Sequence, residues 1–194
     1  MGGQYFSNAG IFLIETLFGL YILIVMLRFL LQLVRADFYN PFSQFLVKVS
    51  NPALNPLRKI VPGIGGIDWA SVVLLFLLKI AELLLISLLP KYSMPAIPGL
   101  LVITTAELLS MLINIFLFGI LIQVVISWIN PGSYNPIVGL IHQLTEPLMR
   151  PARRMVPPIS GLDLSPMLVI IGLYLMTMLL VQPLLDFGRR LAFY

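Results

Sequence analysis

Four stretches of this chain are long and apolar enough to cross a lipid bilayer, and they limit its possible folds more than any other feature. They cover residues 11–34, 69–90, 103–129 and 164–185. A transmembrane helix needs about 20 mostly apolar residues, because the hydrocarbon core is about 30 Å thick. Only 10% of the residues are charged, whereas soluble domains have about 25%. We therefore predict an all-α membrane protein with four transmembrane helices.

The sequence repeats itself with a constant offset of 95 residues. The matching pairs are Asn40 and Asn135, Pro41 and Pro136, Arg58 and Arg153, Pro62 and Pro157, and Asp68 and Asp163. Internal similarity of this kind indicates two copies of one structural unit. We predict two repeats, residues 1–94 and 95–194, each made of a span, an amphipathic loop and a second span. Because two spans separate equivalent points, both copies enter the membrane from the same side, as parallel repeats do.

The long loop inside each repeat has the pattern of an amphipathic helix. Apolar residues recur at helical spacing after Pro41 and again after Pro136. We predict a short helix at the membrane surface in each loop. Prolines follow in both copies, and we expect them to break the helix, because proline lacks the N–H donor and clashes one turn back. These prolines are Pro52, Pro56, Pro147 and Pro151.

A basic pair follows the prolines in each loop: Arg58 with Lys59, and Arg153 with Arg154. We expect these residues to bind phosphates of anionic lipid headgroups, or to dock the acidic surface of a partner. The two long loops carry seven Lys or Arg, against three in the short loop and the C-terminal tail. Because basic loops stay in the cytoplasm, we predict that the long loops are cytoplasmic and that both termini lie outside.

Asp68 and Asp163 each stand just before a predicted span. A carboxylate at this place can accept hydrogen bonds from the free N–H groups of the first helical turn, where the helix dipole also favours negative charge. We interpret both residues as helix caps, with ion coordination as the alternative.

Ionisable residues within a span cost at least about 2.5 kcal/mol at mid-span, so each suggests a function. Lys79 and Glu82 are neighbours on one helical face. We predict that they form an ion pair facing another helix, with an ion or proton relay and a partner contact as alternatives. Arg28 is expected to extend its charged end to the cytoplasmic surface. Glu107 and Asn114 belong to a polar stripe that stops part way along its span, which favours helix contact over conduction.

The residues that enzymes and metal sites need are scarce. There is no cysteine, and His142 is the single histidine. The phosphate-binding P-loop and the Gly-x-Ser-x-Gly and His-Glu-x-x-His motifs are absent from the sequence. We therefore expect no enzyme, no metal, no cofactor and no nucleic acid partner.

The doubled motif resembles the YggT family, also called the YlmG or CCB3-like family. It consists of Asn-Pro, then Pro-x-x-x-x-x-Arg-x-x-x-Pro, then Gly-(Ile/Leu)-Asp, set between paired spans. The resemblance implies a small bacterial inner-membrane protein with two such modules. Members have been associated with osmotic or ion homeostasis, with cell division and membrane organisation, and in plastids with maturation of the haem of cytochrome b6. The resemblance implies no catalytic residue.

Two functions stay open at this point. The first is a non-enzymatic interaction, assembly or membrane-organisation factor linked to osmotic or envelope homeostasis, which would contact anionic lipids and other membrane proteins or itself. The alternative is an ion channel or transporter, or its modulator, in osmotic or potassium homeostasis.

Overall fold

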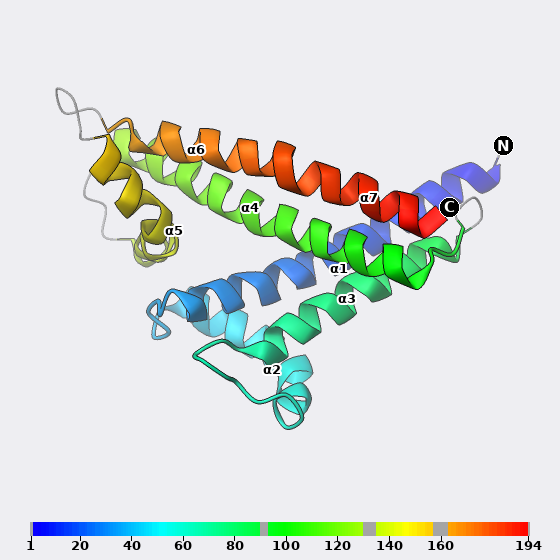
Figure 1. Ribbon diagram of the computed structural model, residues 1–194. Helices are drawn as coiled ribbons and strands as arrows, with labels where there is room; N and C mark the ends of the chain where they lie inside the picture. The colour runs from blue at the N-terminus through cyan, green and yellow to red at the C-terminus, as the bar shows by residue number, and fades with distance from the viewer. Residues whose placement is uncertain (1, 90–92, 130–134, 157–162, 194) are drawn as a thin grey trace.

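The computed structural model describes residues 2–89, 93–129, 135–156 and 163–193. The described chain is helical apart from its connections, which confirms the all-α class (Figure 1). The helices are α1 (Gly2–Leu33), α2 (Pro41–Arg58), α3 (Trp69–Ser87), α4 (Ile97–Ile129), α5 (Pro136–Met155), α6 (Ser165–Met176) and α7 (Gln182–Phe193). A π-helical turn, η1 (Thr177–Val181), joins α6 to α7 without interruption.

Four helical segments are long and apolar enough to cross a membrane, as the sequence predicts. They are Tyr5–Leu33, Trp69–Ser87, Ile97–Ile129 and Ser165–Phe193. Three of them extend beyond the predicted spans, because a helix does not stop where its apolar run ends. With 33 residues, α4 is about 50 Å long, so it exceeds the hydrocarbon core or tilts within it.

The two repeats run in the same direction. Both α2 and α5 lie at one end of the bundle, and both termini lie at the other end (Figure 1). In the first repeat α1 packs against α3, and in the second α4 packs along α6, η1 and α7. Contact between α3 and α4 joins the repeats, which gives the parallel arrangement that the 95-residue offset predicts.

Each amphipathic helix begins at the repeated Asn-Pro motif. The side-chain Oδ1 of Asn40 accepts a hydrogen bond of 2.9 Å from the backbone N–H of Phe42. The side chain of Asn135 makes the same bond, also 2.9 Å, to the N–H of Ile137. The proline that follows takes the first helical position in both copies, where its missing N–H costs nothing.

The prediction that prolines break these helices is wrong. Pro52 and Pro56 lie inside α2, and Pro147 and Pro151 lie inside α5. Each pair is spaced by four residues and all four side chains are exposed. The backbone carbonyls one turn before these prolines have no N–H group to accept from. Because the prolines are exposed, these carbonyls face outward, where water or headgroups can bind them. The prolines bend the helix rather than end it, and the bend of α5 is visible in Figure 1.

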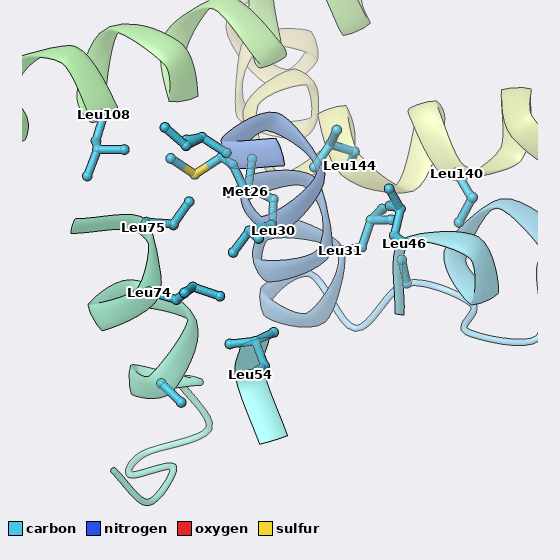
Figure 2. Close-up of a cluster of buried hydrophobic side chains, with 14 residues drawn as sticks. Met26, Leu30, Leu31, Leu46, Leu54, Leu74, Leu75, Leu108, Leu140 and Leu144 are labelled. Carbon is cyan, nitrogen blue, oxygen red and sulfur yellow. The ribbon is translucent and has the colours of Figure 1, made fainter. Parts of the chain in front are cut away.

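The main apolar core crosses the boundary between the repeats. Figure 2 shows leucines of α1, α2 and α3 in one cluster with Leu108 of α4 and Leu140 and Leu144 of α5. Leu31 of α1, Leu46 of α2 and Leu140 and Leu144 of α5 are all at most 5% exposed. Beside this core, the Asn40 amide Nδ2 donates a 2.7 Å hydrogen bond to the carbonyl of Pro136. The two Asn-Pro motifs are therefore in direct contact.

The backbones of α4 and α7 approach each other closely. The backbone N–H of Ala96, just before α4, donates a 2.9 Å hydrogen bond to the carbonyl of Ala192. A Cβ atom added to Gly99 would lie 2.2 Å from the backbone nitrogen of Ala192. Small residues at a helix interface allow this kind of contact in membranes.

Candidate functional site

A polar side chain of the first span anchors the amphipathic helix in the first repeat. Nη1 of Arg28, on α1, donates hydrogen bonds to Oγ of Ser50 at 2.6 Å and to Oδ1 of Asn51 at 2.9 Å, both on α2. Arg28 is only 4% exposed. The expectation that its charged end reaches the cytoplasmic surface is therefore wrong, because α2 folds over it and supplies the hydrogen-bond acceptors.

The second repeat has the same anchor in an uncharged form. Gln123 and Thr145 stand 95 positions after Arg28 and Ser50. Oγ1 of Thr145 donates a 2.7 Å hydrogen bond to Oε1 of Gln123. A hydroxyl on the amphipathic helix thus meets a long polar side chain of the preceding span in both copies.

A second repeated contact joins the end of the amphipathic helix to the start of the next span. In the first repeat, Nη2 of Arg58 donates to Oδ2 of Asp68 in an ion pair. Asp68 is the N-cap of α3 and also accepts a 2.9 Å hydrogen bond from Oγ of Ser71. Burial acts to raise the pKa of Asp68, but the hydrogen bonds from Arg58 and Ser71 outweigh it and hold the pKa below its ordinary value.

The corresponding contact in the second repeat is more open. Nε of Arg153 lies 3.3 Å from Oδ2 of Asp163, and its Nη1 lies 3.0 Å from Oε2 of Glu146. Asp163 accepts a 2.9 Å hydrogen bond from the N–H of Ser165 in the first turn of α6. The effect of burial on the Asp163 pKa is again outweighed, here by hydrogen bonds from Ser165 and Arg153, and the pKa is lowered.

These contacts change the interpretation of the two basic pairs. Arg58 and Arg153 hold the amphipathic helices to the spans, and their charge is compensated by carboxylates. The second member of each pair, Lys59 or Arg154, is exposed and has no carboxylate within 4 Å among the described residues. The positive charge that is available at this end of the bundle therefore comes from Lys59 and Arg154, together with the exposed Arg35, Lys48 and Arg150.

Three ionisable side chains within the spans form a cluster between the repeats. Nζ of Lys79 lies 3.0 Å from Oε1 of Glu82 on the same helix and 2.7 Å from Oε2 of Glu107 on α4. The ion pair of Lys79 and Glu82 that the sequence predicts is present. Its bridge to Glu107 is not predictable from spacing, because it depends on how α3 and α4 pack. The cluster holds two carboxylates and one ammonium group.

Lys79 and Glu107 also line one end of a cavity of about 680 Å³ between the repeats. Ser110 and Asn114 continue this polar end along α4, and the rest of the wall is apolar. Gln123, farther along α4, lines a different cavity of about 880 Å³. The polar groups of α4 therefore do not form one continuous path through the described part of the bundle.

The remaining residues singled out from the sequence take no part in the contacts described above. Pro62 is exposed, and Pro157 lies outside the described residues. His142 is exposed beside Glu146 on α5. Among the residues that the structure describes, no three His, Cys, Asp or Glu side chains lie close enough together to hold a metal ion. The glycines before α3 form a tight turn, in which Gly65 and Gly66 both have positive φ.

Comparison with known proteins finds the same repeat elsewhere. The family model described as CCB3/YggT matches residues 7–89 and again residues 102–184. An uncharacterised protein of Pseudomonas aeruginosa is 47% identical over 179 residues, which cover 92% of this chain and 91% of that protein. The uncharacterised protein YggT of Escherichia coli K12 is 36% identical over 186 residues, 95% of each chain. No solved structure matches.

Proposed function

The chain belongs to the CCB3/YggT family, and from this premise we propose that it is a non-enzymatic organiser of the bacterial inner membrane. In this role it holds two basic amphipathic helices on the cytoplasmic surface and assembles there with anionic lipids and with other membrane proteins or itself. The process that it serves is osmotic or envelope homeostasis.

One observation carries this proposal: three long polar side chains of the spans make helix-to-helix contacts, whereas several basic side chains at the loop end have no carboxylate within 4 Å among the described residues. Arg28 and Gln123 anchor α2 and α5, and Lys79 is neutralised by Glu82 and Glu107. Such pairing supports a rigid scaffold more than a water-filled path. Lys59 and Arg154 then present charge at the level of lipid headgroups, where each basic residue contributes about 1 kcal/mol of attraction.

The test is a double charge reversal, Lys59→Glu with Arg154→Glu, followed by crosslinking to lipids and proteins in native membranes. We expect the loss of most crosslinks from α2 and α5, with unchanged folding, because neither residue has an ion-pair partner among those described. The matched control is Arg189→Glu with Arg190→Glu, the same charge change at the opposite end of the bundle. Crosslinks that are the same in both double variants would refute the proposal.

The orientation is part of the proposal and can be tested separately. The chain has no cysteine, so single cysteines at Lys59 and at Phe193 can be labelled with a membrane-impermeant maleimide in intact spheroplasts. We expect labelling at position 193 only. Labelling at position 59 alone would reverse the orientation and place the basic helices outside.

A second candidate function is ion transport or its modulation, favoured by the cluster of Lys79, Glu82 and Glu107 beside a cavity of about 680 Å³. Potassium and proton flux through proteoliposomes would be compared for the natural chain and for Lys79→Ala with Glu82→Ala. Flux that the double variant abolishes would establish transport and place its path at α3. Absence of flux with correctly folded, inserted protein would leave the scaffold function.

A further inference from the structure

Arg28 is a buried charge with no carboxylate of the described chain in contact with it. Its Nη1 is bound by two neutral groups, Ser50 and Asn51, while its Nε is buried without any hydrogen-bond partner. No Asp or Glu carboxylate of the described chain lies within 4 Å of it. A buried cation is costly unless an anion and further hydrogen bonds compensate it. The protein itself supplies only the neutral part of that compensation.

A cavity of about 410 Å³ opens directly beside this side chain. Arg28, Gln32, Arg58 and Asp68 supply its polar wall, and Phe38 and Val61 are among its apolar lining residues. The volume corresponds to about 14 water molecules at about 30 Å³ each, which is enough for a glycerophosphate headgroup. The cavity lies where the end of α1, α2 and the loop before α3 meet, so it is at the loop end of the bundle.

The charges around this cavity do not cancel. Arg58 is paired with Asp68, and Asp68 is also held by Ser71 as the cap of α3. The guanidinium of Arg28 is therefore the excess charge. Arg28 stands five positions before Leu33, which places it only about 8 Å from the end of α1. At this depth the anion most available to a membrane protein is a lipid phosphate.

The second repeat shows what the same place looks like without the charge. There Gln123 replaces Arg28, and Thr145 replaces Ser50 as its partner. The helix-to-helix anchor is kept, so the positive charge of Arg28 is not needed for anchoring. Its presence in the first repeat alone requires another explanation.

We propose that this cavity, which we name the Arg28 cavity, is a binding site for the phosphate of one anionic phospholipid from the surrounding leaflet. The phosphate accepts hydrogen bonds from the guanidinium N–H groups of Arg28 that face the cavity, and Gln32 and Arg58 stand on the same wall. The inference extends the proposed scaffold function, because it assigns one structural lipid to the first repeat. It depends on Arg28, whereas the surface interactions proposed above depend on Lys59 and Arg154.

The test is lipid retention by the purified, delipidated full chain, measured by native mass spectrometry with phosphatidylglycerol, phosphatidylcholine or inorganic phosphate added. We expect one phosphatidylglycerol per chain to bind about tenfold or more tightly than phosphatidylcholine. Both lipids carry the phosphate, but the choline ammonium of phosphatidylcholine cancels its negative charge and repels the Arg28 cation. The decisive variant is Arg28→Gln, which gives the first repeat the side chain that the second repeat already uses. We expect it to abolish the tenfold preference.

Two controls separate this site from general surface charge. Lys59→Gln removes one exposed charge near the same helix end and is expected to keep the preference, while Arg28→Gln is expected to leave the crosslinks from α2 and α5 intact. Should Arg28→Gln fail to fold, Arg28→Lys keeps the charge and should keep the preference for phosphatidylglycerol. An unchanged preference in Arg28→Gln, its loss in Arg28→Lys, or displacement of the lipid by inorganic phosphate alone would overturn the proposal.

Discussion

The contact between α4 and α7 yields a sharp prediction, because it leaves no space for a single methyl group. In Gly99→Ala, the new Cβ would lie 2.2 Å from the backbone nitrogen, 2.4 Å from Cα and 2.5 Å from Cβ of Ala192. None of these atoms can move away by a change of rotamer. Ordinary contacts begin at 3.4 Å, so the two helices must separate by about 1 Å along this stretch.

The expected cost follows from this separation. Overpacking of a close-packed interface costs about 1–3 kcal/mol, and occasionally more. We place Gly99→Ala at the upper end, about 3 kcal/mol, because the separation also stretches the hydrogen bond from Ala96 to Ala192, now 2.9 Å. Gly188→Ala, whose Cβ would lie 2.9 Å from the side chain and 3.0 Å from the backbone nitrogen of Ile103, should cost about 1 kcal/mol.

The matched control is Gly172→Ala in α6, where an added Cβ meets nothing within 4 Å. Here alanine should stabilise the helix by about 0.5–1 kcal/mol. The free energy of unfolding would be measured by detergent titration of the purified variants, with tryptophan fluorescence as the signal. If Gly99→Ala proved as stable as Gly172→Ala, the close approach of α4 and α7 would be disproved.

Three further predictions concern stability and use the same unfolding measurement. Lys79→Met leaves Glu82 and Glu107 without their cation and should lower the free energy of unfolding by about 3–5 kcal/mol. Replacing all three residues by apolar ones should change it little. If both variants lost the same free energy of unfolding, the ion pairing would be contradicted. Arg35 has a φ of 54°, so Arg35→Gly should stabilise the end of α1 by about 1 kcal/mol, and destabilisation would refute this. Because the pKa of Asp68 is lowered in the folded state, the contribution of this carboxylate to the free energy of unfolding is present above about pH 4. It is lost as the pH falls through the folded pKa. The Asp68→Asn variant should not show this loss of stability at low pH.

The spans, the repeat and the amphipathic helices could be predicted because they depend on local patterns. Apolar length defines the spans, and the offset of 95 residues defines the copies. The caps at Asn40 and Asp68 are also local, since each side chain binds an N–H two or three residues away. Contacts of this kind join residues that are close in the chain, so the sequence pattern alone predicts them.

The contacts that were missed all depend on tertiary packing. The partner of Lys79 on α4 follows from the register between α3 and α4, which no spacing encodes. The burial of Arg28 follows from the way in which α2 folds back over α1. The continuation of α2 through Pro52 depends on which side of the helix faces outward. In each case the contact depends on a surface that forms only after the helices have packed together.

The core shared between the repeats also determines the order in which the protein can be completed during synthesis. Leu108 of α4 and Leu140 and Leu144 of α5 complete a cluster whose other buried members come from the first three helices and the turn after α1. The Asn40 amide likewise finds its acceptor only in the carbonyl of Pro136. The first three helices therefore emerge from the ribosome with an open apolar face. That face is fully covered only when residue 144 has been made, so the two halves repeat one motif in sequence but complete a single unit in biogenesis.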